Sequence, residues 1–378
     1  MKYFNKLILL LVFGCIGSVS ADQELSCLDS SSKPHFDLER KRNLYLKTYG
    51  SKHYKVLDKE QKLALCVEVY SANFFDLAEK LCFGDYHKEL SINDQVALRH
   101  LQGFILIHQL KFSSAIENSN AILESVRIQR LRVKKDSVNY WKLDYFKFHA
   151  LLYKMISMSF MNNKRKELEN LKIKIEDLLS GVDFDSCVYV LYLGNALTIF
   201  PDQANRLITK YSKLSTTTDC SLKIQRVIND FLRYKQYTDN KISSEELFME
   251  LENEVVRLEE ECDLINLAAS LIELSHLKWG TASEDSAKYL KKIEQIARIT
   301  GDKSIWGRAY WIRAINEATK GQIDSAIFFF DSACTQITEN AMVNYSEAFG
   351  GVPVLVGQSK KILDAAYSKS LCAHEAAR

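Results

Sequence analysis

The sequence predicts an all-α protein, and three observations support this prediction. The 378 residues include only 3 prolines, whereas average usage of about 5% would give roughly nineteen. Glycine is also scarce, with 14 residues, so the chain lacks the turn residues that an all-β protein needs. Small residues recur at helical spacing, as in the segment KGQIDSAIFFFDSAC from Lys320 to Cys334. We therefore expect long helices that few residues interrupt.

The first 21 residues have the composition of a secretory signal peptide. Lys2 and Lys6 form a basic start, residues 7–16 are apolar, and Val19-Ser20-Ala21 provides small residues for cleavage. The apolar run is too short to cross a bilayer core of about 30 Å. We expect export to a periplasm. Lipidation at Cys15 is the alternative fate of the same segment.

The charge balance limits the kinds of partner. The chain has 50 basic and 48 acidic residues, and removal of the two signal-peptide lysines leaves 48 of each. Binding to nucleic acid needs an excess of positive charge, so the balance argues against a nucleic-acid partner. After residue 21 no apolar stretch approaches the roughly 18 residues of a membrane span. We expect no transmembrane segment in the mature chain.

The segment around Gly321 predicts a helical hairpin. Small side chains at Ala314 and Ala326 would let two helix backbones approach closely, while Tyr310 and Phe330 would fill the wider end. Gly321 would turn the chain between the two helices. The same pattern recurs 39 residues upstream. Three pairs of positions coincide under this shift: Asp302 with Asp263, Ala314 with Ser275, and Ala326 with Ala287.

Ala314 and Ala326 are twelve residues apart with Gly321 between them, and Ala333 follows seven residues later. This spacing of small residues resembles the tetratricopeptide repeat (TPR), a helix–turn–helix unit of about 34 residues. The motif covers residues 261–337, although Thr338 replaces the final consensus proline and Glu317 replaces a usual tyrosine. The rest of the segment 57–260 matches by position only. The resemblance implies an α-solenoid of about seven helical hairpins over residues 57–337. A lead-in at 22–56 would precede the solenoid, and a capping segment at 338–378 would follow it.

In the TPR family, the first helix of each hairpin lines a concave groove that holds peptides or other protein segments. The resemblance assigns six residues to this groove: Ile272, His276, Trp279, Arg308, Trp311 and Ile315. For Trp279 and Trp311, the alternative is that they pack between hairpins.

The cysteines permit disulfides in an exported chain. Cys66 and Cys82 occupy facing positions in one expected hairpin, where either a disulfide or two buried thiols would fit. Cys187, Cys220 and Cys262 occupy equivalent positions in different hairpins. Equivalent helices lie about 8–10 Å apart, which is too far for a bridge. These three are therefore thiols or pair with other cysteines.

Two charged segments are either solvated faces or electrostatic docking surfaces. The acidic segment covers residues 245–263, where Arg257 is the single basic residue. The basic segment consists of Arg127, Arg130, Arg132, Lys134 and Lys135.

The sequence contains no recognisable catalytic, cofactor or metal motif. Its histidines lack the spacing of a helical zinc site, and it has no phosphate-binding glycine loop. We expect a non-enzymatic interaction protein that binds another envelope or periplasmic protein or peptide. One alternative is an extracytoplasmic sensory subunit of a signalling system. Another is a glycan-cleaving enzyme on a helical superhelix, which would need a buried carboxylate in a cleft.

Overall fold

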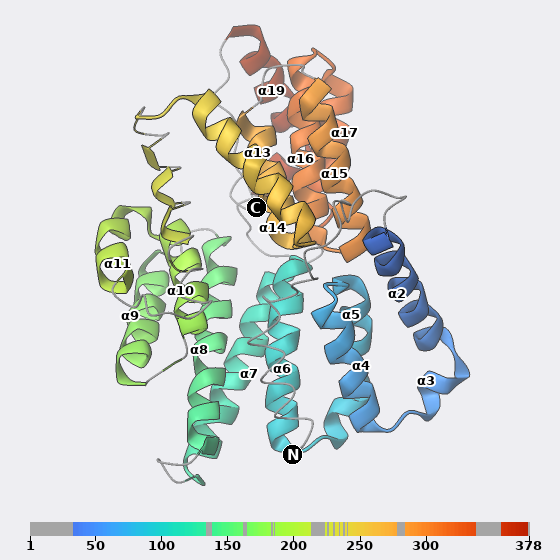
Figure 1. Ribbon diagram of the computed structural model, residues 1–378, viewed down its shortest axis with the longest axis vertical. Helices are drawn as coiled ribbons and strands as arrows, with labels where there is room; N and C mark the ends of the chain where they lie inside the picture. The colour runs from blue at the N-terminus through green and yellow to red at the C-terminus, as the bar shows by residue number, and fades with distance from the viewer. Residues whose placement is uncertain are drawn as a thin grey trace. The chain divides into compact units, whose positions relative to one another are not determined.

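In the computed structural model, every regular element of the described residues is helical (Figure 1). This confirms the predicted all-α class for that part of the chain. The expected signal peptide lies outside the described residues. The structure describes residues 33–133, 138–161, 165–182, 184, 186–212, 224, 227–229, 231–233, 235–236, 239, 241–277, 284–337 and 357–376.

The chain forms two compact units. Unit 1 combines residues 1–111 with residues 248–378, and unit 2 comprises residues 112–247. Both ends of the chain therefore contribute to one unit, while the middle forms the other. Each unit is described by itself below.

The N-terminal part of unit 1 contains a disulfide-linked hairpin, α4–α5. An Asp58–Gln61 capping box starts α4 and satisfies backbone N–H groups at that end. The Cα atoms of Cys66 and Cys82 lie 5.2 Å apart, and their sulfur atoms are bonded. The structure thus contains the disulfide rather than two thiols at these positions. The elements of this part are α2 (Lys33–Gly50), α3 (Lys52–Val56), α4 (Lys59–Ser71), α5 (Phe75–Cys82), the 3-10 helix η1 (Asp85–Glu89) and α6 (Ile92–His108).

The C-terminal part of unit 1 contains the hairpin expected around Gly321. Helices α16 and α17 pack side by side (Figure 1), and Ala314 and Ala326 are fully buried. A second disulfide, between Cys334 and Cys372, ties α17 to α20. The elements here are α13 (Ser244–Glu260), which begins at the end of unit 2, α14 (Leu264–Leu277), α15 (Glu284–Thr300), α16 (Lys303–Thr319), α17 (Ile323–Cys334), α19 (Gly357–Lys369) and α20 (Leu371–Ala376).

One type of turn recurs between helices. Asn73, Leu110, Cys262, Gly301 and Gly321 all have positive φ, from 51° to 83°. After four of them, all except Gly301, the next residue donates its backbone N–H to the carbonyl five positions back. This bond is typical of a Schellman motif, which ends a helix with one left-handed residue. Cys262 and Gly301 are the positions that the 39-residue shift superimposes, so both copies of the repeat share this conformation.

The turn between α15 and α16 is the point where the two ends of the chain meet within unit 1. The side chain of Asp302 caps α16 by accepting hydrogen bonds from the N–H groups of Ser304 at 2.8 Å and Ile305 at 3.3 Å. From the end of α6, His108 contacts Asp302 through Nδ1, and Gln109 donates from Nε2 to the carbonyl of Gly301 at 2.9 Å. A short polar turn is therefore held by residues almost two hundred positions away.

A second contact at the same turn comes from α2 and α5. Arg42 donates to both carboxylate oxygens of Asp76, at 2.9 and 2.7 Å, and to the carbonyl of Ile299 at 3.1 Å. A Cβ atom at Gly301 would overlap the Asp76 carboxylate. Glycine is required there both for its positive φ and for this close approach. In an open solenoid each hairpin contacts its neighbours, so these long-range contacts differ from that expectation.

Unit 2 is a set of consecutive helices, in which α8 packs against both α7 and α9. Phe148, Tyr192 and Phe200 are fully buried in it. Cys187 is disulfide-bonded, whereas Cys262 of unit 1 carries a thiol. The elements of unit 2 are α7 (Phe112–Arg130), α8 (Val138–Ser159), α9 (Arg165–Gly181), α10 (Ser186–Ile199), the 3-10 helix η2 (Pro201–Gln203) and α11 (Ala204–Tyr211).

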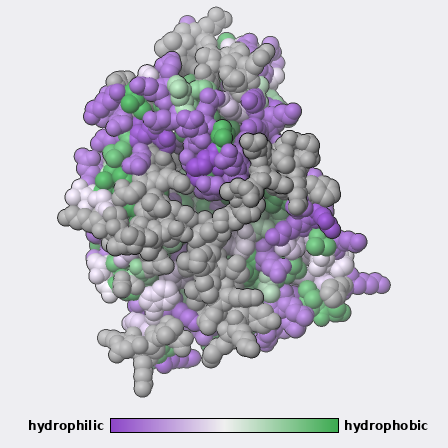
Figure 2. All heavy atoms as spheres, viewed as in Figure 1, coloured by the Kyte–Doolittle hydropathy of each residue, from purple (hydrophilic) through white to green (hydrophobic). Residues whose placement is uncertain are grey.

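The surface shown in Figure 2 is mostly hydrophilic, with hydrophobic residues dispersed among polar ones. Dispersed apolar residues of this kind are normal on folded proteins and do not by themselves mark a binding site. Among the described helices, none is both long and apolar enough to cross a membrane.

Candidate functional site

Three of the six expected groove residues belong to the hydrophobic core of unit 1. Ile272 is 4% exposed, and Trp311 and Ile315 are fully buried. The Trp311 ring packs edge to face against Phe330 at 4.9 Å and against Tyr367 of α19 at 5.8 Å. The groove prediction is therefore wrong for these three residues. Their helix faces meet other helices instead of solvent, which for Trp311 agrees with the packing alternative.

The other described groove residues are His276 and Arg308, which belong to two helices that contact each other, α14 and α16. His276 is half-buried near the end of α14, and Arg308 is half-buried on α16. Burial and the positive charge of Arg308 lower the pKa of His276 to about 3. The imidazole is consequently neutral at physiological pH. Trp279, the sixth expected residue, lies outside the described residues.

The Nε atom of Arg308 is buried and has no hydrogen-bond partner among the described residues. Burial lowers the pKa of Arg308, while Asp302 and Glu273 oppose that effect through their charges. A guanidinium group has five N–H donors and is costly to leave without acceptors in a partly buried position. This geometry suits an incoming carboxylate, which can accept two parallel hydrogen bonds from one arginine.

A buried carboxylate in unit 2 bears on the possibility of glycan cleavage. Glu176 is buried and accepts a hydrogen bond from the Tyr192 hydroxyl at 2.9 Å. Nitrogen atoms of Lys172, Arg206 and Lys210 lie 3.3, 3.3 and 3.6 Å from its carboxylate oxygens. Burial raises the pKa of Glu176, but the Tyr192 hydrogen bond and the lysines outweigh burial and lower it. A carboxylate held ionised in this way is unsuited to act as the general acid of a glycosidase, which needs a raised pKa.

The expected basic segment is partly neutralised by nearby acids. Arg127 forms an ion pair with Glu124 on the same exposed helix face, at 2.7 Å. Arg130 forms an ion pair with Asp144 and stacks over the Tyr140 ring at 5.1 Å. Lys134 and Lys135 lie outside the described residues, and Arg132 is exposed.

The expected acidic segment is also partly paired. Arg257 binds Glu254 at 2.5 Å and also contacts Glu261, and Lys292 of α15 binds Glu259. These pairs reduce the charge that the segment offers to a partner. The solvated-face interpretation is therefore the better supported one for both charged segments.

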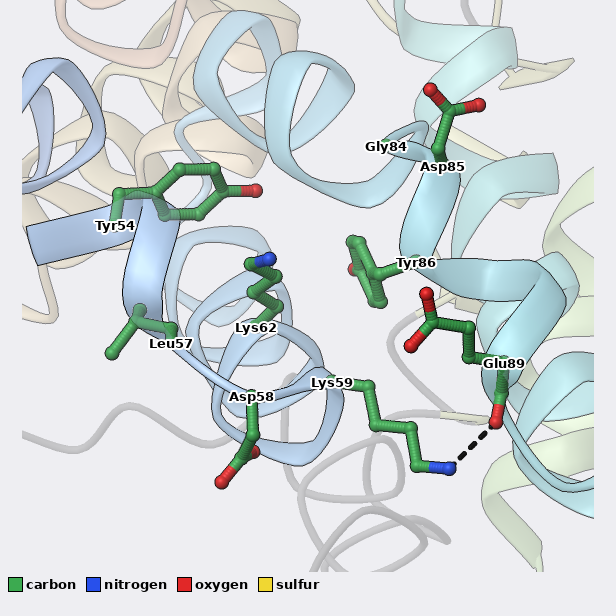
Figure 3. Close-up of a pocket in the computed structure, with 9 residues that line it drawn as sticks. All are labelled: Tyr54, Leu57, Asp58, Lys59, Lys62, Gly84, Asp85, Tyr86 and Glu89. Atoms are coloured by element: carbon green, nitrogen blue, oxygen red, sulfur yellow. Dashed lines mark hydrogen bonds between the residues drawn. The ribbon is translucent and has the colours of Figure 1, made fainter. Parts of the chain in front are cut away.

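A second surface feature was not anticipated from the sequence. Residues from the start of α4 and from η1 line an open hollow in unit 1 (Figure 3). Its walls include tyrosine hydroxyls and lysine ammonium groups. No spacing pattern in the sequence marks these residues, because they come from a loop, the start of a helix and a short 3-10 helix.

No family model, curated protein or solved structure matches this chain. The comparisons therefore assign no function to Arg308 or to the hollow. Among the described residues, no group of three or more histidine, cysteine, aspartate or glutamate side chains is placed to hold a metal ion.

Proposed function

We propose that this chain is an exported, non-enzymatic interaction protein that binds an acidic segment of another envelope or periplasmic protein. The observation on which this proposal depends is the Arg308 guanidinium, whose buried Nε atom has no hydrogen-bond partner among the described residues. An aspartate, a glutamate or a chain-terminal carboxylate of the partner would supply an acceptor. Arginine is also among the residues that most often dominate the binding energy of an interface.

Two features support an interaction role over catalysis. Helical hairpins resembling the TPR present long faces that suit protein segments. Of the three buried carboxylates among the described residues, Asp144 is paired with Arg130. Glu176 and Asp302 both have a lowered pKa and fixed hydrogen-bond partners. Their role is therefore structural.

Export is supported by the signal-like N-terminal sequence and by the disulfides. Bridges at Cys66–Cys82 and Cys334–Cys372 are typical of oxidising compartments such as a bacterial periplasm. Because they tie neighbouring helices together, they would stabilise the protein outside the cytoplasm.

The proposal is tested by capture from an envelope extract with the mature protein as bait. Wild type, Arg308→Lys and Arg308→Ala are compared, with Arg298→Ala as control because Arg298 is exposed on α15. We expect a specific prey to be lost with Arg308→Ala, weakened with Arg308→Lys and retained with Arg298→Ala. Lysine keeps the positive charge but lacks the planar guanidinium group, which can donate two parallel hydrogen bonds to a carboxylate.

A competition experiment checks the chemistry of the prey. A glutamate-rich peptide should displace the captured protein, and the matching glutamine-rich peptide should not. If all four baits recover the same proteins in equal amounts, Arg308 is not the binding residue and the proposed site is wrong.

A further inference from the structure

The hollow in unit 1 has the dimensions of a small-molecule site. It encloses about 520 Å³, within the range of ligand pockets, which is about 300–1,000 Å³. The disulfide Cys66–Cys82 links α4 to α5. In the sequence, α5 lies between α4 and η1, which contribute residues to the walls of the hollow. The residues that line the hollow are Tyr54, Leu57, Asp58, Lys59, Lys62, Gly84, Asp85, Tyr86 and Glu89 (Figure 3).

Tyr86 places an unsatisfied hydroxyl group at the base of this hollow. Its side chain projects from η1 toward the helix that carries Lys62 (Figure 3). The residue is only 7% exposed, and its hydroxyl has no hydrogen-bond partner among the described residues. A Cβ atom at Gly84 would lie 3.0 Å from the Tyr86 ring, so glycine allows the ring to pack there. A buried hydroxyl without a partner is destabilising, and a ligand acceptor would offset that cost.

Lys62 supplies a positive charge that has no carboxylate partner in the described part of the chain. Its ammonium group lies over the Tyr54 ring, 5.7 Å from the ring centre, and the side chain is half-buried. Lys59, in contrast, donates to the backbone carbonyl of Glu89 at 2.7 Å (Figure 3). Lys62 is therefore the cation available to a ligand.

Tyr54 completes a set of three converging donors. Burial raises the pKa of Tyr54. Burial, with a smaller contribution from Tyr54, also raises the pKa of Tyr86. Both tyrosines line the hollow (Figure 3). Both stay protonated at neutral pH, so both can donate. Two hydroxyls and the Lys62 ammonium group match a ligand oxygen that carries negative charge.

The acidic residues around the hollow limit the charge of that ligand. Asp58 is engaged in capping α4, and the fully exposed Asp85 side chain points away from the hollow (Figure 3). The carboxylate of Glu89 points back toward Tyr86 (Figure 3). A dianion such as phosphate would be repelled by Glu89. A ligand that carries a positive group close to its carboxylate would instead be attracted by Glu89.

We propose that this hollow binds a small zwitterion, namely a free α-amino acid. The ligand carboxylate would accept hydrogen bonds from Lys62 and Tyr86, and its ammonium group would lie beside Glu89. The site is separate from Arg308, so it does not depend on the proposed protein-binding function. No bond is made or broken in this interaction.

The experiment is calorimetric titration of the mature, disulfide-intact protein with glycine, L-alanine and L-leucine. Acetate tests the carboxylate alone, methylamine the cation alone, and inorganic phosphate a plain anion. We expect at least one amino acid to bind about tenfold or more tightly than acetate, methylamine or phosphate. Absence of binding by all three amino acids, or phosphate binding as tightly as they do, would overturn the proposal.

Variants locate the binding within the hollow. Tyr86→Phe and Lys62→Gln should each weaken amino-acid binding by about tenfold. Glu89→Gln should remove the preference for an amino acid over acetate. Lys55→Gln is the control, because Lys55 is an exposed lysine of α3 that does not line the hollow. Equal affinity in all variants would place the ligand elsewhere and overturn the proposal.

Tyr86→Phe also separates a binding effect from misfolding. The hydroxyl that it removes has no partner, so the variant should be as stable as wild type or slightly more stable in urea. Unchanged stability together with weakened binding supports a ligand role. Unchanged stability with unchanged binding would contradict it.

Discussion

The Nδ1 atom of His108 lies 2.5 Å from Oδ2 of Asp302, although 194 residues separate the two in the sequence. The His108 ring is also stacked on Phe75, with ring centres 4.1 Å apart. Asp302 is fully buried and caps α16. The Asp302 side chain therefore caps the backbone N–H groups at the start of α16 and also links the two parts of unit 1 through His108.

We expect Asp302→Ala to destabilise unit 1 by about 2–4 kcal/mol, because it removes a helix cap and leaves His108 without its buried partner. Asp302→Asn should lose less, since asparagine also caps helices and can accept a hydrogen bond from the imidazole. Urea denaturation of the mature protein measures both. If the two variants unfold at the wild-type midpoint, the contact does not hold the unit together.

The contribution of Asp302 should depend on pH in a defined direction. Burial raises the pKa of Asp302, but His108, together with the hydrogen bonds from Ser304 and Ile305, outweighs burial and lowers it. A carboxylate with a lowered folded-state pKa stabilises the protein above its unfolded pKa of about 4. That contribution is lost as the pH falls through the folded-state value.

The difference in unfolding free energy between wild type and Asp302→Asn should therefore shrink as the pH falls below the unfolded-state value of about 4. Denaturation series at several pH values measure it. Glu176 has a lowered pKa as well, but it is present in both proteins and its effect cancels. A difference that grows as the pH falls would contradict the assigned direction.

Substitutions at Cys262 and Gly301 should have opposite effects, although the two positions are equivalent in the repeat. Cys262 has a φ of 51°, which costs a side-chain-bearing residue about 1–2 kcal/mol. Cys262→Gly should thus stabilise the protein by up to about 1 kcal/mol, since part of the gain is offset by chain entropy. Gly301→Ala should be strongly destabilising, because its Cβ would overlap Asp76. Thermal unfolding of both variants distinguishes the signs.

Removal of the Cys66–Cys82 bridge should destabilise the α4–α5 hairpin. The two cysteines are 16 residues apart, and closing a loop of this size is worth about 3 kcal/mol. The double variant Cys66→Ala/Cys82→Ala should show that loss in urea. Reducing buffer also opens the Cys334–Cys372 bridge, so wild type and the variant should have similar stability there, and the loss on reduction should be larger for wild type. Equal stability with and without the bridge would show that it contributes little.

Local spacing in the sequence was sufficient to predict the helical class and the best hairpin. Proline scarcity and the small residues Ala314 and Ala326 predicted two closely packed helices, and both alanines are fully buried. The 39-residue shift also aligned Asp263 with Asp302. Asp263 accepts a hydrogen bond from the N–H of Asn266, as Asp302 does from that of Ile305. These features depend on residues within one or two helical turns of each other.

The groove could not be located in the same way. Periodicity shows which residues share a helix face but not which element covers that face. Trp311 and Ile315 share a face that other helices bury, and Tyr367 of α19, more than fifty residues further along the chain, packs on Trp311. Arg308 was among the expected site residues, but nothing in its spacing indicated that its Nε atom is buried without a hydrogen-bond partner.

The contacts between distant segments were equally inaccessible from the sequence. The ion pair of Arg42 with Asp76 and the contact of His108 with Asp302 follow no repeat. The hollow beside Tyr86 depends on how η1 folds back on α4, which a single sequence does not specify. Chemistry that arises from long-range placement requires the structure.

The composition of unit 1 from both ends of the chain has a consequence for biogenesis. The segment that carries Arg42, Asp76 and His108 leaves the ribosome well before the turn around Gly301. Until that turn arrives, Arg42 and Asp76 can pair with each other, but Arg42 lacks the Ile299 carbonyl and His108 lacks Asp302. The long sequence separation of these contacts delays assembly of the unit. A translation product truncated before the last hairpins would keep those surfaces uncovered, where quality-control proteases could recognise it.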